Sequence, residues 1–68
     1  MRYTIIYHVY NKSINMTHTF PVFMCYFRHI IIKYISKHKD MEMPKNINEM
    51  VYILNLITNN DDVYYELK

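Results

Sequence analysis

The sequence predicts a small α+β domain in which an N-terminal β-hairpin packs on two helices. Apolar and polar residues alternate over residues 3–20, with the period of two that is typical of strands. Two later segments, 21–37 and 46–58, repeat their apolar residues at the helical period. With 68 residues, the chain is expected to form a single domain, near the smallest size at which a hydrophobic core suffices.

The hairpin is expected to have strands at 3–10 and 13–20, joined by a two-residue turn at 11–12. In this register Val9 faces Ile14, one face of the hairpin is apolar and the other is mostly polar. A slip by one residue would mix the two faces, which favours the two-residue turn. The asparagine of the turn suits a left-handed backbone position.

The helix at 21–37 is predicted to be the element against which the rest of the chain packs. Thr19 is a candidate N-cap, and Pro21 suits a first helical turn, where a missing N–H is tolerated. At the helical period one broad apolar arc contains Phe23, Met24, Phe27, Ile30, Ile31, Tyr34 and Ile35.

A charged linker at 38–45 is expected to separate the two helices. Asn46, followed three residues later by Glu49, has the pattern of a capping box and predicts a second helix up to residue 58. Asn48 and Asn55 are expected on the polar side of that helix, opposite its apolar face.

The tail at 59–68 is predicted to begin with a left-handed cap at Asn59 and Asn60. The rest of the tail fits either a short capped turn or a last strand, and periodicity does not decide between them.

The composition excludes several classes of function. The chain has no glycine, so it has neither a phosphate-cradling loop nor a dinucleotide fingerprint. A net charge of +2 is mild, and no nucleic-acid partner is expected. The longest apolar run is broken by Arg28 and His29 and is too short to span a bilayer. The N-terminus lacks the pattern of a signal peptide, so a cytosolic protein without a membrane partner is expected.

No catalytic group, metal site or cofactor is predicted. Cys25 and His29 lie four residues apart, and His8 and His18 lie in the hairpin, which together resemble the donors of a zinc site. The expected register places the two hairpin histidines on opposite faces, and no paired ligand motif supports the site. A non-enzymatic protein is therefore expected.

Protein binding is the function that the hairpin favours, because the edge of a strand can add to the sheet of another protein. The rigid apolar residues at the hairpin exit would act as anchors. The candidate partner-binding residues are Asn15, Met16, Thr17, His18, Thr19, Phe20, Pro21 and Phe23. The competing interpretation is that these residues cover the protein's own core.

A resemblance gives this binding hypothesis a partner. The chain is rich in Ile, Asn, Lys and Tyr and lacks Gly, a bias typical of AT-rich genomes such as those of poxviruses. In size and composition it resembles the small early orthopoxvirus antagonists of interferon signalling that bind the SH2 domain of a STAT transcription factor. The stretch 7–10 is also similar to the Tyr-His-x-His stretch of henipavirus V proteins, with Tyr10 in place of the second His. Asn11-Lys12 stands where those proteins have Gly-Gly.

The resemblance implies that the hairpin adds to the SH2 sheet in the host cytoplasm and blocks docking to the receptor phosphotyrosine. Two other interpretations stay open. The first is a structural viral protein that self-associates through hairpin edges or through Val22 and Ile32. The second is an adaptor whose phosphorylated Tyr64 or Tyr65 recruits SH2 domains.

Overall fold

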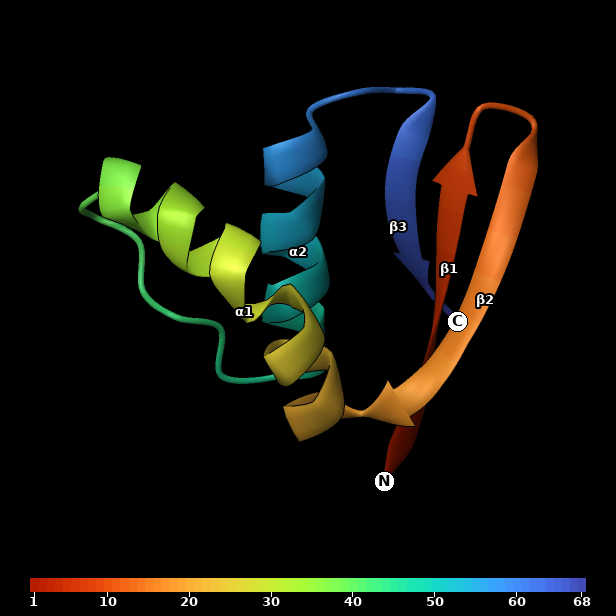
Figure 1. Ribbon diagram of the computed structural model, residues 1–68, viewed down its shortest axis with the longest axis horizontal. Helices are drawn as coiled ribbons and strands as arrows, with labels where there is room; N and C mark the ends of the chain where they lie inside the picture. The colour runs from red at the N-terminus through yellow and green to blue at the C-terminus, as the bar shows by residue number, and fades with distance from the viewer.

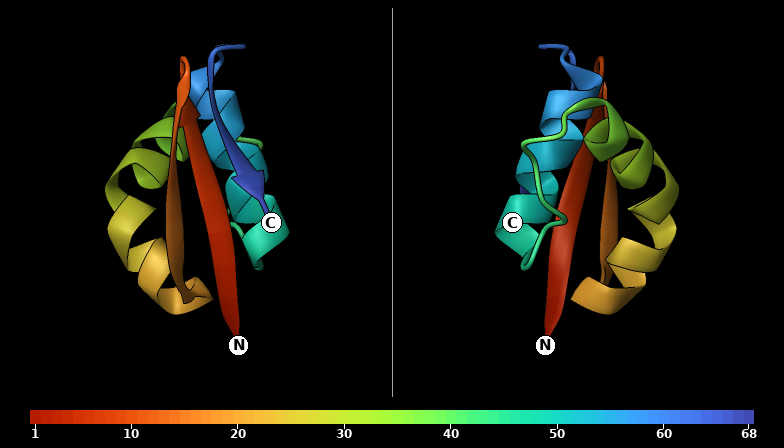
Figure 2. Two further views of the ribbon diagram at one scale, coloured as in Figure 1. Left: turned by 90° about the vertical axis from the view of Figure 1, so that its right-hand side faces the viewer. Right: turned by 90° about the vertical axis from the view of Figure 1, so that its left-hand side faces the viewer.

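The computed structural model describes all of residues 1–68 and contains a three-stranded antiparallel sheet with two helices. The elements in chain order are β1 Arg2–Val9, β2 Lys12–Thr19, α1 Phe20–Lys37, α2 Ile47–Thr58 and β3 Val63–Leu67. Both helices lie on one face of the sheet, and no element covers the other face (Figures 1 and 2). The predicted α+β class is confirmed. Neither helix combines the length and the apolar character that a membrane crossing needs.

The tail of the chain forms a strand, which the sequence had left undecided. β3 pairs with β1, so that Val63 lies opposite Val9 and Leu67 opposite Ile5. The strand order is therefore β2-β1-β3, with the first strand in the centre. The hairpin therefore keeps one open edge, that of β2, because β3 pairs with the other edge of β1.

The hairpin register differs from the predicted one by two residues. Ile14 lies opposite Tyr7 instead of Val9, and Val9 lies opposite Lys12. Because the shift is even, the inner and outer faces keep the residues that the alternation assigned to them. Both strands accordingly begin and end one residue earlier than expected.

The hairpin turn consists of Tyr10 and Asn11 rather than Asn11 and Lys12. Tyr10, not Asn11, has the left-handed backbone, with φ of 55°. The Tyr10 N–H donates a hydrogen bond of 2.7 Å to the Asp62 carbonyl, just before β3. Contact with the third strand thus supports a turn that tyrosine does not favour by itself.

Helix α1 begins as its sequence predicts. The Thr19 hydroxyl accepts a hydrogen bond from the Val22 N–H at 3.4 Å, and Pro21 lies in the first turn. Phe23, Phe27 and Ile31 form the buried stripe of the helix. Ile30, expected in the same arc, is 39% exposed, because α1 diverges from the sheet along its length (Figure 1).

Helix α2 has the predicted caps at both ends. The Asn46 side-chain oxygen accepts a hydrogen bond from the Glu49 N–H at 2.9 Å, and the Glu49 carboxylate accepts one from the Lys45 N–H at 3.1 Å. Asn59 ends the helix in the left-handed region, with φ of 45°. The left-handed cap therefore forms as predicted, and the capping box forms in part, because its return bond comes from the Lys45 N–H instead of the Asn46 N–H.

The core lies between the covered face of the sheet and the two helices. One strand residue, Ile5, packs against the stripes of both helices. The buried cluster consists of Ile5, Phe23, Phe27, Ile31, Ile47, Met50, Val51, Ile53 and Leu54. Burial of these side chains, each stabilising by about 1.5–3 kcal/mol, is the main source of stability in a chain without a disulfide.

Candidate interaction surface

The hydrogen bonds of β1 establish which backbone groups point to each edge of the sheet. The Lys68 N–H donates to the Thr4 carbonyl at 2.9 Å, and the Tyr10 N–H donates to Asp62, so the even positions of β1 bond toward β3. Residues in an antiparallel pair alternate in the direction of their backbone bonds. The odd positions of β1 therefore bond toward β2, where Tyr7 lies opposite Ile14.

The outer edge of β2 is open. Since the even positions of β2 bond to β1, the N–H and C=O groups of Ser13, Asn15 and Thr17 point away from the sheet. No backbone or side-chain hydrogen bond in the structure uses these backbone groups from the outer side. All three residues are exposed. A continuous row of unpaired backbone donors and acceptors therefore follows this strand.

The centre of the outer edge of β3 is blocked by one side chain from α2. The Asn55 amide nitrogen donates to the Tyr65 carbonyl at 2.9 Å, and the Tyr65 N–H donates to the Asn55 side-chain oxygen at 2.7 Å. The amide thus makes the two bonds that a neighbouring strand would make. The prediction that Asn55 lies on the polar, outward side of the helix is wrong, because this residue is half-buried against β3.

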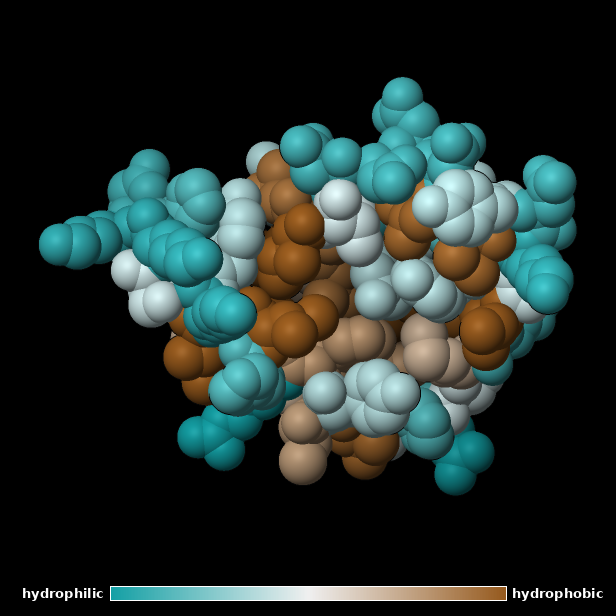
Figure 3. Space-filling view, turned by 45° about the horizontal axis from the view of Figure 1, so that its top comes forward, coloured by the Kyte–Doolittle hydropathy of each residue, from teal (hydrophilic) through white to brown (hydrophobic).

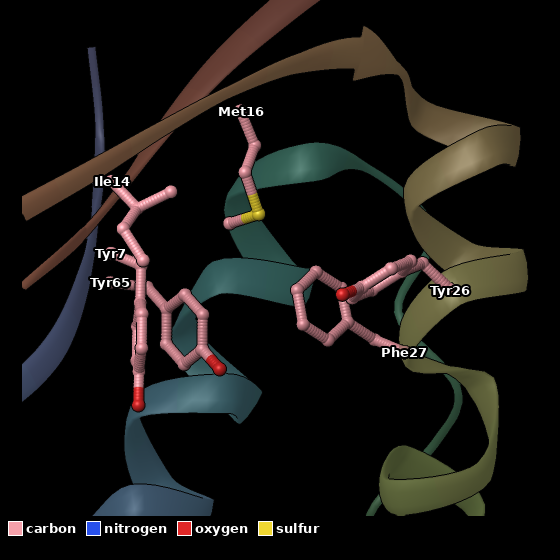
Figure 4. A pocket seen from close by; sticks show the side chains of 6 residues that line it. All are labelled: Tyr7, Ile14, Met16, Tyr26, Phe27 and Tyr65. Carbon is pink, nitrogen blue, oxygen red and sulfur yellow. The ribbon is translucent and has the colours of Figure 1, made fainter.

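An apolar groove lies between the inner face of the sheet and α1, beside the open edge. Its volume is about 300 Å³, and it is lined by Tyr7, Ile14, Met16, Tyr26, Phe27 and Tyr65. Figure 4 shows Ile14 and Met16 descending from β2 and Tyr26 and Phe27 facing them from α1. The space-filling view shows apolar residues gathered in a hollow with hydrophilic residues on both sides (Figure 3).

Aromatic contacts form the inner wall of the groove. The ring centroids of Tyr7 and Tyr65 are 4.8 Å apart, and Phe27 meets Tyr65 edge to face at 5.6 Å. Burial raises the pKa of Tyr65 above its ordinary value of 10.0, and the nearby phenols of Tyr7 and Tyr26 raise it further. These ring contacts stabilise the inner wall, and the groove is present in the chain without a partner.

Four of the sequence-predicted binding residues lie on β2 before its last residue, Thr19, and they divide between the two faces. Asn15 and Thr17 have outward backbone groups and side chains on the uncovered face, where the Thr17 hydroxyl lies 2.9 Å from that of Thr4. Met16 lines the groove. His18 lies on the inner face, with its ring 5.3 Å from that of Phe23, edge to face.

The other four lie at the junction of β2 and α1. Thr19 caps the helix, Pro21 is exposed in its first turn, and Phe20 is half-buried against the core. Phe23 is 1% exposed and is part of the core. A partner cannot reach Phe23 in this fold, so the competing interpretation, coverage of the protein's own core, describes this residue.

Sequence reasoning missed the residues that complete the groove. Ile14 is 53% exposed and Tyr26 is 74% exposed, although both have large apolar surfaces. Tyr26 lies outside the apolar arc of α1, and its proximity to β2 depends on the angle between helix and sheet. The only sequence signal was the continuation of the alternating pattern through Ile14.

The four residues considered for metal binding or catalysis do not come together as one group. No group of three or more His, Cys, Asp or Glu side chains lies close enough to hold a metal ion. His8 and His18 occupy opposite faces of the sheet, as expected. His8 lies 2.8 Å from the Glu66 carboxylate, and Cys25 and His29 are exposed on the outer side of α1.

Comparisons with protein-family models, with curated proteins and with solved structures found no match for this chain. The open edge of β2 and the groove beside it are therefore the features from which a function can be inferred.

Proposed function

We propose that this protein is a non-enzymatic host-interaction protein that binds its partner by β-strand addition at the outer edge of β2. The observation that carries the proposal is the asymmetry of the sheet: Asn55 bonds the central outward backbone groups of β3, those of Tyr65, whereas the backbone groups of Ser13, Asn15 and Thr17 have no partner. An added strand would pair with these groups and gain affinity from backbone hydrogen bonds.

The order and composition of β2 in the free chain favour binding by strand addition. The strand is eight residues long and is already ordered against β1. It lacks proline and acidic residues, which often protect exposed edges, and Lys12 at its start is its one cation. A preformed strand avoids most of the ordering cost that a disordered segment meets on binding.

For the partner, we propose the SH2 domain of a STAT transcription factor in the host cytoplasm, as the resemblance to orthopoxvirus interferon antagonists implies. SH2 domains contain a sheet to which a strand can add. Occupation of that sheet beside the phosphotyrosine site would block docking to the receptor, and interferon signalling would fail. No cofactor takes part in this mechanism.

Calorimetric titration of the full chain into a recombinant STAT protein that contains its SH2 domain tests the proposal. We expect binding at micromolar or lower concentration and competition with a receptor phosphopeptide. Asn15→Pro removes an outward N–H without breaking a bond to β1, and should weaken binding at least about tenfold. Asn15→Ala keeps the N–H and should bind like the parent.

Three results would contradict parts of the proposal. Absence of micromolar binding to STAT proteins would remove that partner. Equal affinities of Asn15→Pro and Asn15→Ala, with both variants folded, would remove strand addition at β2. A concentration-dependent dimer that Asn15→Pro abolishes would favour the structural, self-associating protein instead.

A further inference from the structure

The eight tyrosines of the chain differ in exposure and in backbone conformation. Four are half-buried: Tyr3, Tyr7, Tyr34 and Tyr65. Of the four exposed ones, Tyr26 and Tyr52 lie within α1 and α2, and Tyr10 lies in the hairpin turn with a left-handed backbone. Tyr64, which is 40% exposed, is therefore the one exposed tyrosine on a strand.

The neighbouring tyrosines of β3 point to opposite faces of the sheet. The Tyr64 ring stacks on that of His8, with centroids 4.5 Å apart, on the face that no helix covers (Figure 2). The Tyr65 ring points toward the helices, where it meets Phe27 edge to face, and its backbone groups are bonded by Asn55. An enzyme can therefore reach the Tyr64 side chain without disturbing the core, whereas the Tyr65 side chain is part of the packing against α1.

Two acidic residues come just before the exposed tyrosine. Asp61 and Asp62 precede Tyr64 by three and two residues, and residues 46–67 contain no Lys or Arg. Both aspartates are exposed, and neither carboxylate takes part in an ion pair. These carboxylates are thus free to meet a cationic surface on an enzyme that binds this segment.

The position of β3 suits a segment on which an enzyme acts. It is the last element of the chain, it is five residues long, and it lies at an edge of the sheet. Terminal segments open at a lower free energy than the centre of a fold. A protein kinase has to bring the acceptor hydroxyl into line with the terminal phosphoryl group of ATP. An exposed and extended end segment meets this requirement with less disturbance than a helix interior does.

We infer that Tyr64 is a phosphorylation site for a tyrosine kinase that prefers acidic residues before its acceptor. The phenol oxygen of Tyr64 forms the new P–O bond with the γ-phosphoryl group of ATP, ADP leaves, and the phenol proton passes to the catalytic aspartate of the kinase. The product gains a charge of about −1.5 to −2 on the uncovered face. The inference goes beyond the proposed function, because β1 separates this strand from the open edge of β2.

Phosphorylation of the full chain with Mg²⁺ and ATP tests the inference. The enzyme is a purified catalytic domain of a cytosolic tyrosine kinase that accepts acidic polymers of glutamate and tyrosine, and fragment mass spectrometry locates the phosphate. We expect one phosphate per chain, on Tyr64. Tyr64→Phe keeps a ring beside His8 and should lower kcat/KM at least about tenfold, whereas Tyr65→Phe should stay within about twofold of the parent. Equal midpoints in denaturant would show that Tyr64→Phe is folded.

Neutralising the aspartates tests how the site is recognised. Asp61→Asn/Asp62→Asn should lower kcat/KM at least about fivefold, whereas Asp40→Asn, an exposed control in the linker, should behave like the parent. A phosphate mainly on Tyr65 or on another tyrosine, or no phosphorylation, would overturn the assignment of Tyr64. Equal kcat/KM of the double variant and the parent would overturn recognition through the aspartates. None of these results depends on binding to a STAT protein.

Discussion

The two outer edges of this small sheet differ in the hydrogen bonding of their outward backbone groups. β3 has its central outward N–H and C=O groups bonded by the Asn55 side chain, and the strand is five residues long. β2 is eight residues long, and no side chain satisfies its outward backbone groups. The edge formed by the tail of the chain is therefore blocked at its centre, whereas the edge formed by the hairpin is free to pair along its length.

The difference limits how strands can be added to the domain. A sheet with two open edges can stack copies head to tail without closing, which leads to fibres. With β3 closed, one copy of this domain can accept one strand. The closed edge thus protects the protein from open-ended assembly while the open edge serves the proposed interaction.

The largest expected effect is a loss of stability, on substitution of residues that connect the two edges through the core. Phe27 lines the groove beside β2 and also contacts Tyr65 of β3, and Ile31 is fully buried one turn later. Phe27→Ala and Ile31→Ala should each lower the free energy of unfolding by about 2–5 kcal/mol. Denaturant titration measures this loss, and midpoints equal to that of the parent would show that the stripe is misassigned.

Opening the closed edge should turn the protein into one that self-associates. Asn55→Ala leaves the Tyr65 backbone groups without their partners and should cost about 1–3 kcal/mol of stability. The freed β3 edge carries acidic neighbours and can then pair with the basic β2 edge of another copy. Light scattering should show concentration-dependent oligomers, and adding Asn15→Pro should restore the monomer. A strictly monomeric Asn55→Ala would contradict the protective role.

Proline substitution along β2 should report which backbone groups are free. Met16→Pro removes a bond to β1 and should destabilise the fold by about 1–3 kcal/mol, whereas Asn15→Pro, which removes no such bond, should cost clearly less. Amide hydrogen exchange of the parent protein tests the same bonding directions. The Met16 amide should exchange slowly and the Asn15 amide should exchange fast. The Tyr65 amide should be slow in the parent and fast in Asn55→Ala. Similar exchange at Met16 and Asn15 would contradict the assigned bonding directions.

The smallest effect is a dependence of stability on alkaline pH. Because the pKa of Tyr65 is raised in the folded state, folding keeps its proton bound where the unfolded chain releases it. This contribution is complete below about pH 10 and is lost as the pH rises through the folded pKa. Ultraviolet titration should find one tyrosine that ionises later than the others. Tyr65→Phe should remove that late step and make the free energy of unfolding less dependent on pH above about pH 10.

The local structure of this protein follows from the sequence alone. The capping box at Asn46 and Glu49, the Thr19 cap and the helical spacing of Phe23, Phe27 and Ile31 act over one or two turns, so neighbours in sequence suffice to determine them. The two faces of the hairpin were also predictable, because alternation assigns a face independently of the register as long as any shift is even.

Only the tertiary structure decided the sheet edges and the groove. The short run Val63–Leu67 becomes a strand because β1 offers it a partner more than fifty residues away in sequence. The same contact moves the hairpin turn to Tyr10, through the bond to Asp62. Asn55 became an edge cap, and Tyr26 part of a groove, because of the angles at which α1 and α2 meet the sheet. Pairing and packing between segments distant in sequence have no local signal, so the open edge on which the proposed function depends could be located only in the folded chain.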